Sequence, residues 1–220
     1  MAVWTISAQE GTGGARVAAA LAAAADVSLV DRETLALLAH EADPALPVLD
    51  DVEGRFGSRF KLLSLSTAMT AGSVDAFFEV ELRQKLPALG RAVMDRAARS
   101  PCVIYAGAGF AALPDHPTAI HLRLWAPLAW RITAYQREQI VDRPCAEKAL
   151  KCDDQRKKDL VRSLYHVDID DARRFSLVLD ASRFSPDRIV EILLAAGGVT
   201  ALRPDTSGVS VSPAAALPFH

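Results

Sequence analysis

The chain has 220 residues, of which 50% are hydrophobic and 24% are charged, so its length suits one domain and its composition excludes wholesale disorder. The formal net charge of −2 excludes an overall basic field for nucleic acid. The 3 cysteines show no Cys-x-x-Cys spacing, which excludes a disulfide framework, disfavours a zinc site and predicts a cytoplasmic protein.

Short apolar segments alternate along the chain with longer segments of helical pattern. The short segments predict strands at Ala2–Ser7, Val27–Val30, Pro101–Ala106, Ala119–Trp125 and Ser176–Leu179. The longer segments predict helices at Gly14–Ala25, Arg32–Glu41, Val74–Ala98, Leu128–Glu138, Ala146–His166 and Pro186–Ala196. Because strands separated by helices pair in parallel through right-handed crossovers, the sequence predicts an α/β fold with about five parallel strands and helices on both faces.

Three segments stand apart from this alternation. Residues 43–73 carry prolines, glycines, serines and charges, and are interpreted as an insertion beside a site. Residues 197–220 predict a loosely ordered tail with one short strand at Gly208–Val211. The apolar run Val17–Ala25 is too short for a membrane span, which needs about 20 residues. Because Glu10 and glycines precede it rather than a cationic start, it is interpreted as a buried helix and not as a signal peptide.

A glycine-rich loop, Gly11-Thr12-Gly13-Gly14, follows the first predicted strand and leads into the first helix. Glycines let backbone N–H groups converge, and a helix N-terminus adds partial positive charge, so this loop predicts a phosphate-binding cradle. The pattern is incomplete, because the P-loop register Gly-x-x-x-x-Gly-Lys-Ser/Thr here reads Ala8, Gly13, Gly14, Ala15. The alternative is a tight strand-to-helix turn without a ligand.

Five blocks of the chain, in order, resemble the cytidylate kinase-like proteins, a nucleoside monophosphate kinase branch of the P-loop proteins. They are Thr5–Gly14, Val30–Glu33, Pro101–Ile104, Ala126–Arg131 and Leu177–Arg183. The resemblance implies a P-loop NTPase-like three-layer domain over residues 1–196 with a helical lid over residues 128–166. It also implies ATP- and Mg²⁺-dependent phosphoryl transfer to a nucleoside monophosphate, nominally CMP or dCMP. The donor phosphates would then contact Gly11, Thr12, Gly13, Gly14 and Arg16.

The chain lacks arginine at three positions where members of this family usually have it. Ala8 and Ala15 stand where the family usually carries arginine, and an arginine expected near Gly107 is absent. Because phosphoryl transfer depends on positioning and charge neutralisation, these losses should cost several kcal/mol of transition-state stabilisation unless other cations compensate.

Basic residues of the predicted lid are the candidates for that compensation. From Lys148 to Arg162 the chain carries 6 basic and 3 acidic residues. Arginine suits phosphate because its planar fork donates two hydrogen bonds, so Arg131, Arg156 and Arg162 are predicted to neutralise the transferred group. Lys157 and Lys158 are weaker candidates. The alternative is a solvated helix face supported by i,i+3 ion pairs.

Two aspartates end predicted strands at the open edge of the sheet. Asp31 is a candidate for orienting Mg²⁺ or the acceptor nucleotide, or else for capping the helix that starts at Arg32. Asp180 either lies near where an adenine could bind or serves as a turn or cap residue ahead of Pro186, and the second interpretation is favoured. The histidines show no metal-binding spacing, so no metal site is predicted from protein ligands alone. Trp4, Trp125 and Trp130 are interpreted as packing residues.

The sequence therefore predicts a nucleotide-binding protein with kinase chemistry, active in the cytoplasm without membrane or nucleic-acid partners. The apolar alanine, leucine and phenylalanine content is compatible with a homodimer surface. Loss of the family cations favours an alternative, a catalytically degenerate nucleotide sensor or interaction module that keeps the fold. A third hypothesis is a purely structural partner-binding domain whose interface is residues 43–73 or the tail.

Overall fold

A computed structural model describes residues 2–42, 87–106 and 108–199. Its centre is a five-stranded parallel sheet with the strand order β2-β3-β1-β4-β5. The strands are β1 (Val3–Ala8), β2 (Ser28–Val30), β3 (Cys102–Ile104), β4 (Ala119–Trp125) and β5 (Leu177–Asp180). The five predicted strands are thereby confirmed.

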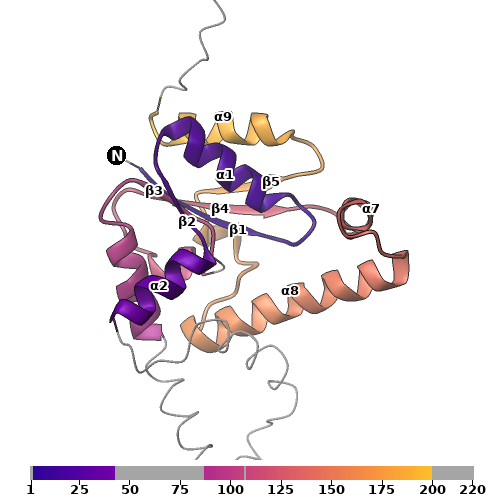
Figure 1. The fold of residues 1–220 in the computed structure, drawn as a ribbon, viewed down its shortest axis with the longest axis horizontal. Coiled ribbons are helices and arrows are strands. Elements are labelled where there is room, and N and C mark those ends of the chain that lie inside the picture. The colour runs from indigo at the N-terminus through magenta and orange to yellow at the C-terminus, as the bar shows by residue number, and fades with distance from the viewer. Residues whose placement is uncertain (1, 43–86, 107, 200–220) are drawn as a thin grey trace, which may run out of the picture.

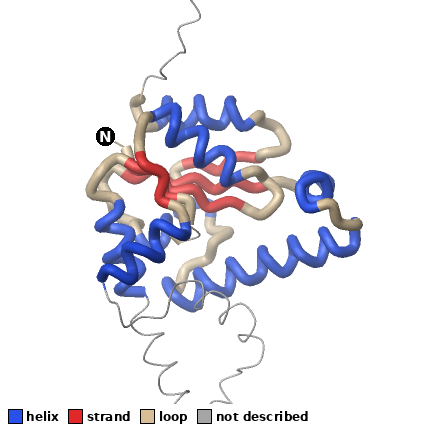
Figure 2. The backbone as a smooth tube through the Cα atoms, viewed as in Figure 1, coloured by secondary structure: helices blue, strands red, loops and turns tan. Residues whose placement is uncertain are grey.

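Helices cover both faces of the sheet, as Figures 1 and 2 show. They are α1 (Gly14–Ala25), α2 (Arg32–Ala42), α6 (Gly109–Ala112), α7 (Leu128–Gln139), α8 (Arg143–Tyr165) and α9 (Pro186–Ala196), with a 3₁₀ turn at Ala172–Arg174. Residues 87–97 are also helical. In Figure 1, α1 and α9 lie above the sheet, and α2 and α8 lie below it. The predicted α/β fold with helices on both faces is therefore confirmed.

Alternation along β1 directs its side chains to two different cores. Trp4 and Ile6 pack with Leu21 of α1 and Leu193 of α9 on one face. The indole N–H of Trp4 donates to the carbonyl oxygen of Leu193 at 3.0 Å. Because a buried indole that keeps its hydrogen bond avoids a desolvation penalty, Trp4 fixes α9 against the sheet.

The opposite face of the sheet combines an apolar core with buried polar groups. Val3 packs there with residues of α2, α6 and α8. Thr5 Oγ1 lies 2.7 Å from His121 Nδ1, and Arg123 donates to Ser7 Oγ at 3.3 Å. Burial lowers the pKa of both His121 and Arg123. These four polar residues come from β1 and β4, and Ser7 and Arg123 lie toward the ends of their strands that lead to the glycine loop and α7.

The predicted lid segment is a helical hairpin formed by α7 and α8. Ile132 of α7 packs against Ala146 and Leu150 of α8 in a small core of its own. Asp142 caps α8 by accepting a hydrogen bond from the backbone N–H of Cys145 at 2.9 Å. This cap, with a proline in the first turn, explains why α8 begins three residues before the predicted start at Ala146.

Some predictions fall on segments that the structure does not describe. These are the insertion at 43–73, the first part of the helix predicted at Val74–Ala98, the residue Gly107 and the tail with its short strand. Among the described helices, none is long and apolar enough to cross a membrane.

Candidate phosphate-binding site

The glycine loop joins β1 to α1 and contains two residues with left-handed backbone. Gly11 has φ 79° and Gly13 has φ 74°, a conformation that side chains disfavour. A Cβ atom at Gly11 would lie 3.0 Å from the carbonyl oxygen of Arg131 in α7. Glycine is therefore required here both by the backbone conformation and by the close approach of the neighbouring helix.

Hydrogen bonds from Gln9 hold the loop to the end of β4. The Gln9 N–H donates to the carbonyl of Leu124 at 3.0 Å, and its side-chain oxygen accepts from the N–H of Ala126 at 3.2 Å. Thr12 donates through both its N–H and its hydroxyl to the Gln9 carbonyl, at 3.3 Å and 2.5 Å. These bonds fold the loop back on itself and fix its shape.

Several backbone donors of the loop remain available to an anion. Within the described part of the chain, no acceptor pairs with the N–H groups of Gly11, Gly13, Gly14 and Ala15. Gly14 and Ala15 open a helix of 12 residues, where the helix dipole favours negative charge. The predicted loop residues thus combine free N–H groups with a helix N-terminus, which is the donor set that a phosphate group accepts.

Arg131, predicted to neutralise phosphate, is buried beneath the loop and engaged with protein acceptors. Only 3% of the residue is exposed. Its Nε donates to the Ala126 carbonyl at 3.1 Å, and Nη1 donates to the Glu10 carbonyl at 3.3 Å. Both terminal nitrogens also donate to the carboxylate of Asp154 in α8, at 3.1 Å and 2.7 Å. This guanidinium therefore fastens the loop, α7 and α8 to one another.

Arg16 lies on the exposed side of the loop, as an arginine that binds phosphate would require. A Cβ at Gly13 would lie 3.2 Å from Nη2 of Arg16, so this side chain folds close to the loop. Among the described residues Arg16 has no ion-pair partner. Arg16 directly follows Ala15, and Ala15 is the position at which the cytidylate kinase-like pattern carries an arginine.

Tyr105, the residue that follows β3, packs against the glycine loop. Its ring lies close to Gly14, where an added Cβ would approach Tyr105 Cε2 to 3.1 Å. Burial, followed by the negative charges of Glu10 and Asp153, raises the pKa of Tyr105 to about 12. The phenol consequently stays protonated at neutral pH and keeps a hydroxyl donor beside the start of α1.

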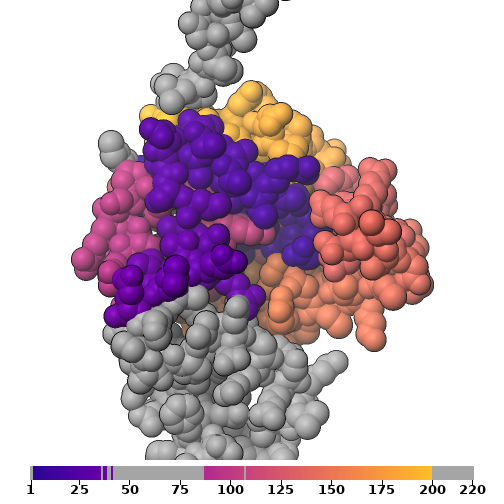
Figure 3. Space-filling view, in the orientation of Figure 1, coloured from indigo at the N-terminus to yellow at the C-terminus, as the bar shows by residue number. Residues whose placement is uncertain are grey.

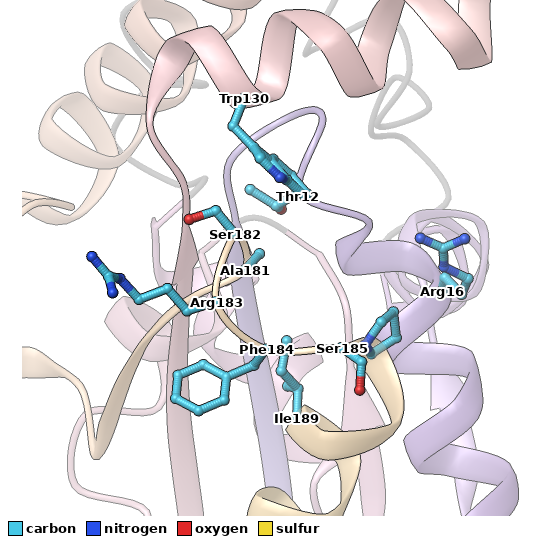
Figure 4. A pocket seen from close by; sticks show the side chains of 10 residues that line it. Thr12, Arg16, Trp130, Ala181, Ser182, Arg183, Phe184, Ser185 and Ile189 are labelled. Atoms are coloured by element: carbon cyan, nitrogen blue, oxygen red, sulfur yellow. The ribbon is translucent and has the colours of Figure 1, made fainter.

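A pocket of about 320 Å³ lies next to the loop, and Figure 4 shows its lining. Thr12 and Arg16 form one side, and Trp130 of α7 lies over Thr12. The rest comes from the connection between β5 and α9, with Ala181, Ser182, Arg183, Phe184 and Ser185, and from α9 itself, with Pro186 and Ile189. The pocket therefore joins the glycine loop to a surface that carries two aromatic rings.

The prediction of packing roles is confirmed for Trp4, which is 1% exposed, and is wrong for Trp125, which is 40% exposed, and for Trp130. Trp130 is 39% exposed and Phe184 is 38% exposed, and both line the pocket. The first turn of α7 turns Trp130 away from the hairpin core, in which its neighbours Leu128 and Ile132 pack. Exposed aromatic rings in a pocket suit the flat face of a nucleobase.

The remaining predicted arginines lie along α8 at different distances from the loop. Arg156 is 45% exposed in its side chain and donates to Asp153 at 2.5 Å. Arg162 is 69% exposed, with Asp168 at 3.9 Å. Arg162 follows Arg156 by six positions in the helix, about 9 Å along the axis. Arg156 therefore shares a helical turn with residues that contact the loop, and Arg162 lies nearer the end of α8.

The two aspartates at strand ends both form local caps. Asp31 Oδ1 accepts from the backbone N–H of Thr34 at 2.9 Å and from its hydroxyl at 2.8 Å, and these bonds lower the pKa of Asp31. Asp180 Oδ1 accepts from the N–H and hydroxyl of Ser182, at 2.9 Å and 2.7 Å. The capping alternative for Asp31 is thus present, and the turn predicted at Asp180 is confirmed.

The donor set of the site suits phosphate better than a metal held by protein alone. Within the described residues no group of three or more His, Cys, Asp or Glu side chains could hold a metal ion. A Mg²⁺ ion that accompanies a nucleotide takes most of its ligands from phosphates and water, with one or two carboxylates. Such an ion fits a site whose own donors are backbone N–H groups, and Asp31, which follows β2, uses a single carboxylate oxygen for its cap.

Comparisons with known proteins agree with this geometry. The model of the cytidylate kinase-like family matches residues 3–183. An uncharacterized protein from Eubacterium ventriosum superposes with a TM-score of 0.66 at 15% identity, covering 90% of this chain and 98% of that one. A gluconokinase from Sinorhizobium meliloti superposes with a TM-score of 0.52 at 14% identity, covering 90% and 91%. The comparison with curated proteins gave no match.

Proposed function

Because the chain belongs to the cytidylate kinase-like family and has a kinase-like nucleotide-binding fold, we propose that it transfers the terminal phosphoryl group of ATP to a nucleoside monophosphate. CMP or dCMP is the nominal acceptor. The observation that carries the proposal is the continuity of the glycine loop with the pocket. The loop offers free backbone N–H groups to phosphates, and the rings of Trp130 and Phe184, which line the same pocket, suit a base.

In this proposal the donor nucleotide lies along the pocket with its phosphates on the loop. Gly11, Gly13 and Gly14 contribute backbone N–H groups, and Thr12 and Arg16 flank the same space. Mg²⁺, bound by the phosphates, would neutralise charge on the transferred group, with Asp31 as the candidate carboxylate. Most of the catalysis comes from positioning and charge stabilisation, because the protein performs little covalent chemistry in phosphoryl transfer.

The arginines divide into two roles under this proposal. Arg156 and Arg162 are exposed on α8 and approach the transferred phosphoryl group when the nucleotide binds. Arg131 acts as a positioning residue, because every nitrogen of its guanidinium donates to a protein oxygen. Arg131 thereby sets the shape of the loop that receives the phosphates.

A nucleotide sensor without catalysis is the second candidate function. The lack of cations in the glycine loop favours it. The loop has alanine or glycine at each position where the P-loop or family pattern places a cation. It also carries the carboxylate of Glu10. An arginine that stabilises the transition state is worth roughly 10³–10⁵ in rate, so the lost cations bear on catalysis more than on binding.

Calorimetry with ATP and with CMP in the presence of Mg²⁺, followed by a coupled assay of ADP release across a panel of nucleoside monophosphates, tests the proposal. A kinase gives heat with ATP and turnover with at least one acceptor. Binding without turnover would identify the sensor. Absence of heat with every nucleotide at millimolar concentration would overturn both nucleotide functions and leave a structural partner-binding domain.

A further inference from the structure

Lys157, a residue of α8, places its ammonium group at the base of the glycine loop. Nζ donates to the carbonyl oxygen of Ala8, the last residue of β1, at 3.2 Å. Ala8 occupies the first position of the P-loop register, and Lys157 follows it by 149 residues. A cation from a distant part of the chain thus lies beside a loop that contains no lysine of its own.

The loop has no room for a lysine at the usual position. In the P-loop register that position is Gly14, where a Cβ atom would lie 2.3 Å from Cβ of Ala8 and 3.1 Å from the Tyr105 ring. Real Cβ atoms essentially never approach other heavy atoms this closely, so any side chain at Gly14 would force β1 and α1 apart. The close packing that excludes a lysine from the loop leaves the adjacent space to a cation from another element.

The hydrogen bonds of Lys157 leave donors available. Nζ lies 2.8 Å from Asp153 Oδ2, an ion-pair contact in which Oδ2 has no properly oriented hydrogen bond. Glu10 Oε2 is 3.8 Å away, beyond hydrogen-bond distance. An ammonium group has three N–H donors, and the Ala8 carbonyl takes one of them. Lys157 can therefore hold the loop and contact a phosphate oxygen at the same time.

Two anionic side chains near Lys157 compete with a phosphate group for its ammonium. Asp153 and Glu10 are both anionic, and Lys157 lies between them at the loop. Arg156 pairs with the other oxygen of Asp153, Oδ1, so that carboxylate lies between two cations of α8. The side chain of Glu10 is 44% exposed and belongs to the loop itself. An incoming phosphate group thus competes for the ammonium with Asp153, at 2.8 Å, and with Glu10, the anionic side chain of the loop itself.

We infer that Lys157 supplies from α8 the phosphate-binding ammonium that P-loop proteins carry inside the loop, and that Glu10 opposes the bound phosphate. The ligand class is a nucleoside triphosphate or diphosphate, held through its β- and γ-phosphates. This inference rests on the proposed nucleotide binding and adds the residue that supplies the loop with its missing cation.

Binding of ATP and of inorganic triphosphate to the full chain, measured by calorimetry, tests the inference. Lys157→Ala should weaken both ligands by about 10- to 100-fold, the loss expected for one charge-assisted hydrogen bond. Lys157→Arg should restore part of the affinity. Glu10→Gln should strengthen both ligands, because it removes the competing charge but keeps the backbone carbonyl that Arg131 uses.

Lys151→Ala is the matched control, since Lys151 also forms an ion pair within α8, with Glu147 at 2.6 Å, and makes no hydrogen bond or ion pair with the loop in the described part of the chain. Thermal melting of each variant separates a lost contact from a lost fold, and Lys157→Arg with Glu10→Gln keeps the test valid if Lys157→Ala fails to fold. Equal affinities for the wild-type chain and Lys157→Ala would overturn the inference alone. A wild-type chain that binds neither ligand would overturn the proposed function instead.

Discussion

Arg131 and Asp154 form a bidentate ion pair that joins α7 to α8 directly beneath the glycine loop. Nη1 and Nη2 of the arginine lie 3.1 Å and 2.7 Å from the two carboxylate oxygens. The arginine side chain is 4% exposed and the aspartate 20%. Because Arg131 also donates to the Glu10 carbonyl, the same pair supports the loop on which the proposed phosphate site depends.

Arg131→Ala should lower the free energy of unfolding by about 3 kcal/mol, since it leaves the Asp154 carboxylate without its buried partner. Urea denaturation measures the change, and a double-mutant cycle with Asp154→Ala isolates the pair energy. Arg188→Ala is the control, because its ion pair with Glu191 is exposed and should contribute less than about 1 kcal/mol. If Arg131→Ala and Arg188→Ala lowered the free energy of unfolding equally, the buried pair of Arg131 with Asp154 would not be a special source of stability.

Gly14→Ala should destabilise the protein by about 1–3 kcal/mol, the usual cost of overpacking. The added Cβ would lie 2.3 Å from Cβ of Ala8. The double variant Ala8→Gly with Gly14→Ala removes the atom it meets, so thermal melting should recover part of the loss. Lack of any recovery would place the strain elsewhere than between β1 and α1.

Trp130→Ala should weaken ATP binding about 10-fold or more while leaving the melting temperature almost unchanged. Stacking of a base on an aromatic ring is worth about 1–3 kcal/mol, and Trp130 is exposed in the pocket. Trp125, which is 40% exposed and does not line the pocket, provides the matched variant Trp125→Ala. Calorimetry with ATP should distinguish them, and equal affinities for the two variants would refute base stacking on Trp130.

Stability should fall when the pH drops below about 6.5, because His121 is buried in its neutral form. Burial, followed by repulsion from His116, lowers its pKa from the ordinary value of 6.5. The unfolded chain therefore binds a proton that the folded chain resists, and stability present above the unfolded pKa is lost as the pH falls through the folded pKa. Melting temperatures at about pH 7.5 and about pH 5.5 should differ more for the wild-type chain than for His121→Asn. The same difference in both proteins would assign the acid sensitivity to other groups.

Periodicity and residue type were sufficient to predict the sheet and most helix limits. The helices at Gly14–Ala25 and Pro186–Ala196 match α1 and α9 to the residue, because an alanine-rich run after Gly13 and a Ser-Pro start define them locally. The glycine loop was predictable for the same reason. Its position between a buried strand and a helix identified the loop, although its sequence departs from the P-loop motif.

Partners of the long side chains could not be predicted from sequence. Arg131 matched a family motif and was expected at the phosphate, yet burial between α7 and α8 turns its donors to protein oxygens. Lys157 had the same sequence evidence as Lys158, and only the docking of α8 separates them. Lys157 contacts Ala8, whereas Lys158 pairs with Asp170 at 2.5 Å. A helix exposes neighbouring residues in directions 100° apart, and which direction meets the loop is a tertiary property.

The hydrogen bond between Lys157 and Ala8 also bears on how the protein folds. It closes a loop of 149 residues, and the bond between Arg131 and Glu10 closes one of 121. Contacts of such high sequence separation carry a large entropy cost of closure and slow the folding of a domain. A nascent chain cannot complete the glycine-loop site until α8 has been synthesised and has docked, so the proposed phosphate site forms only near the end of folding.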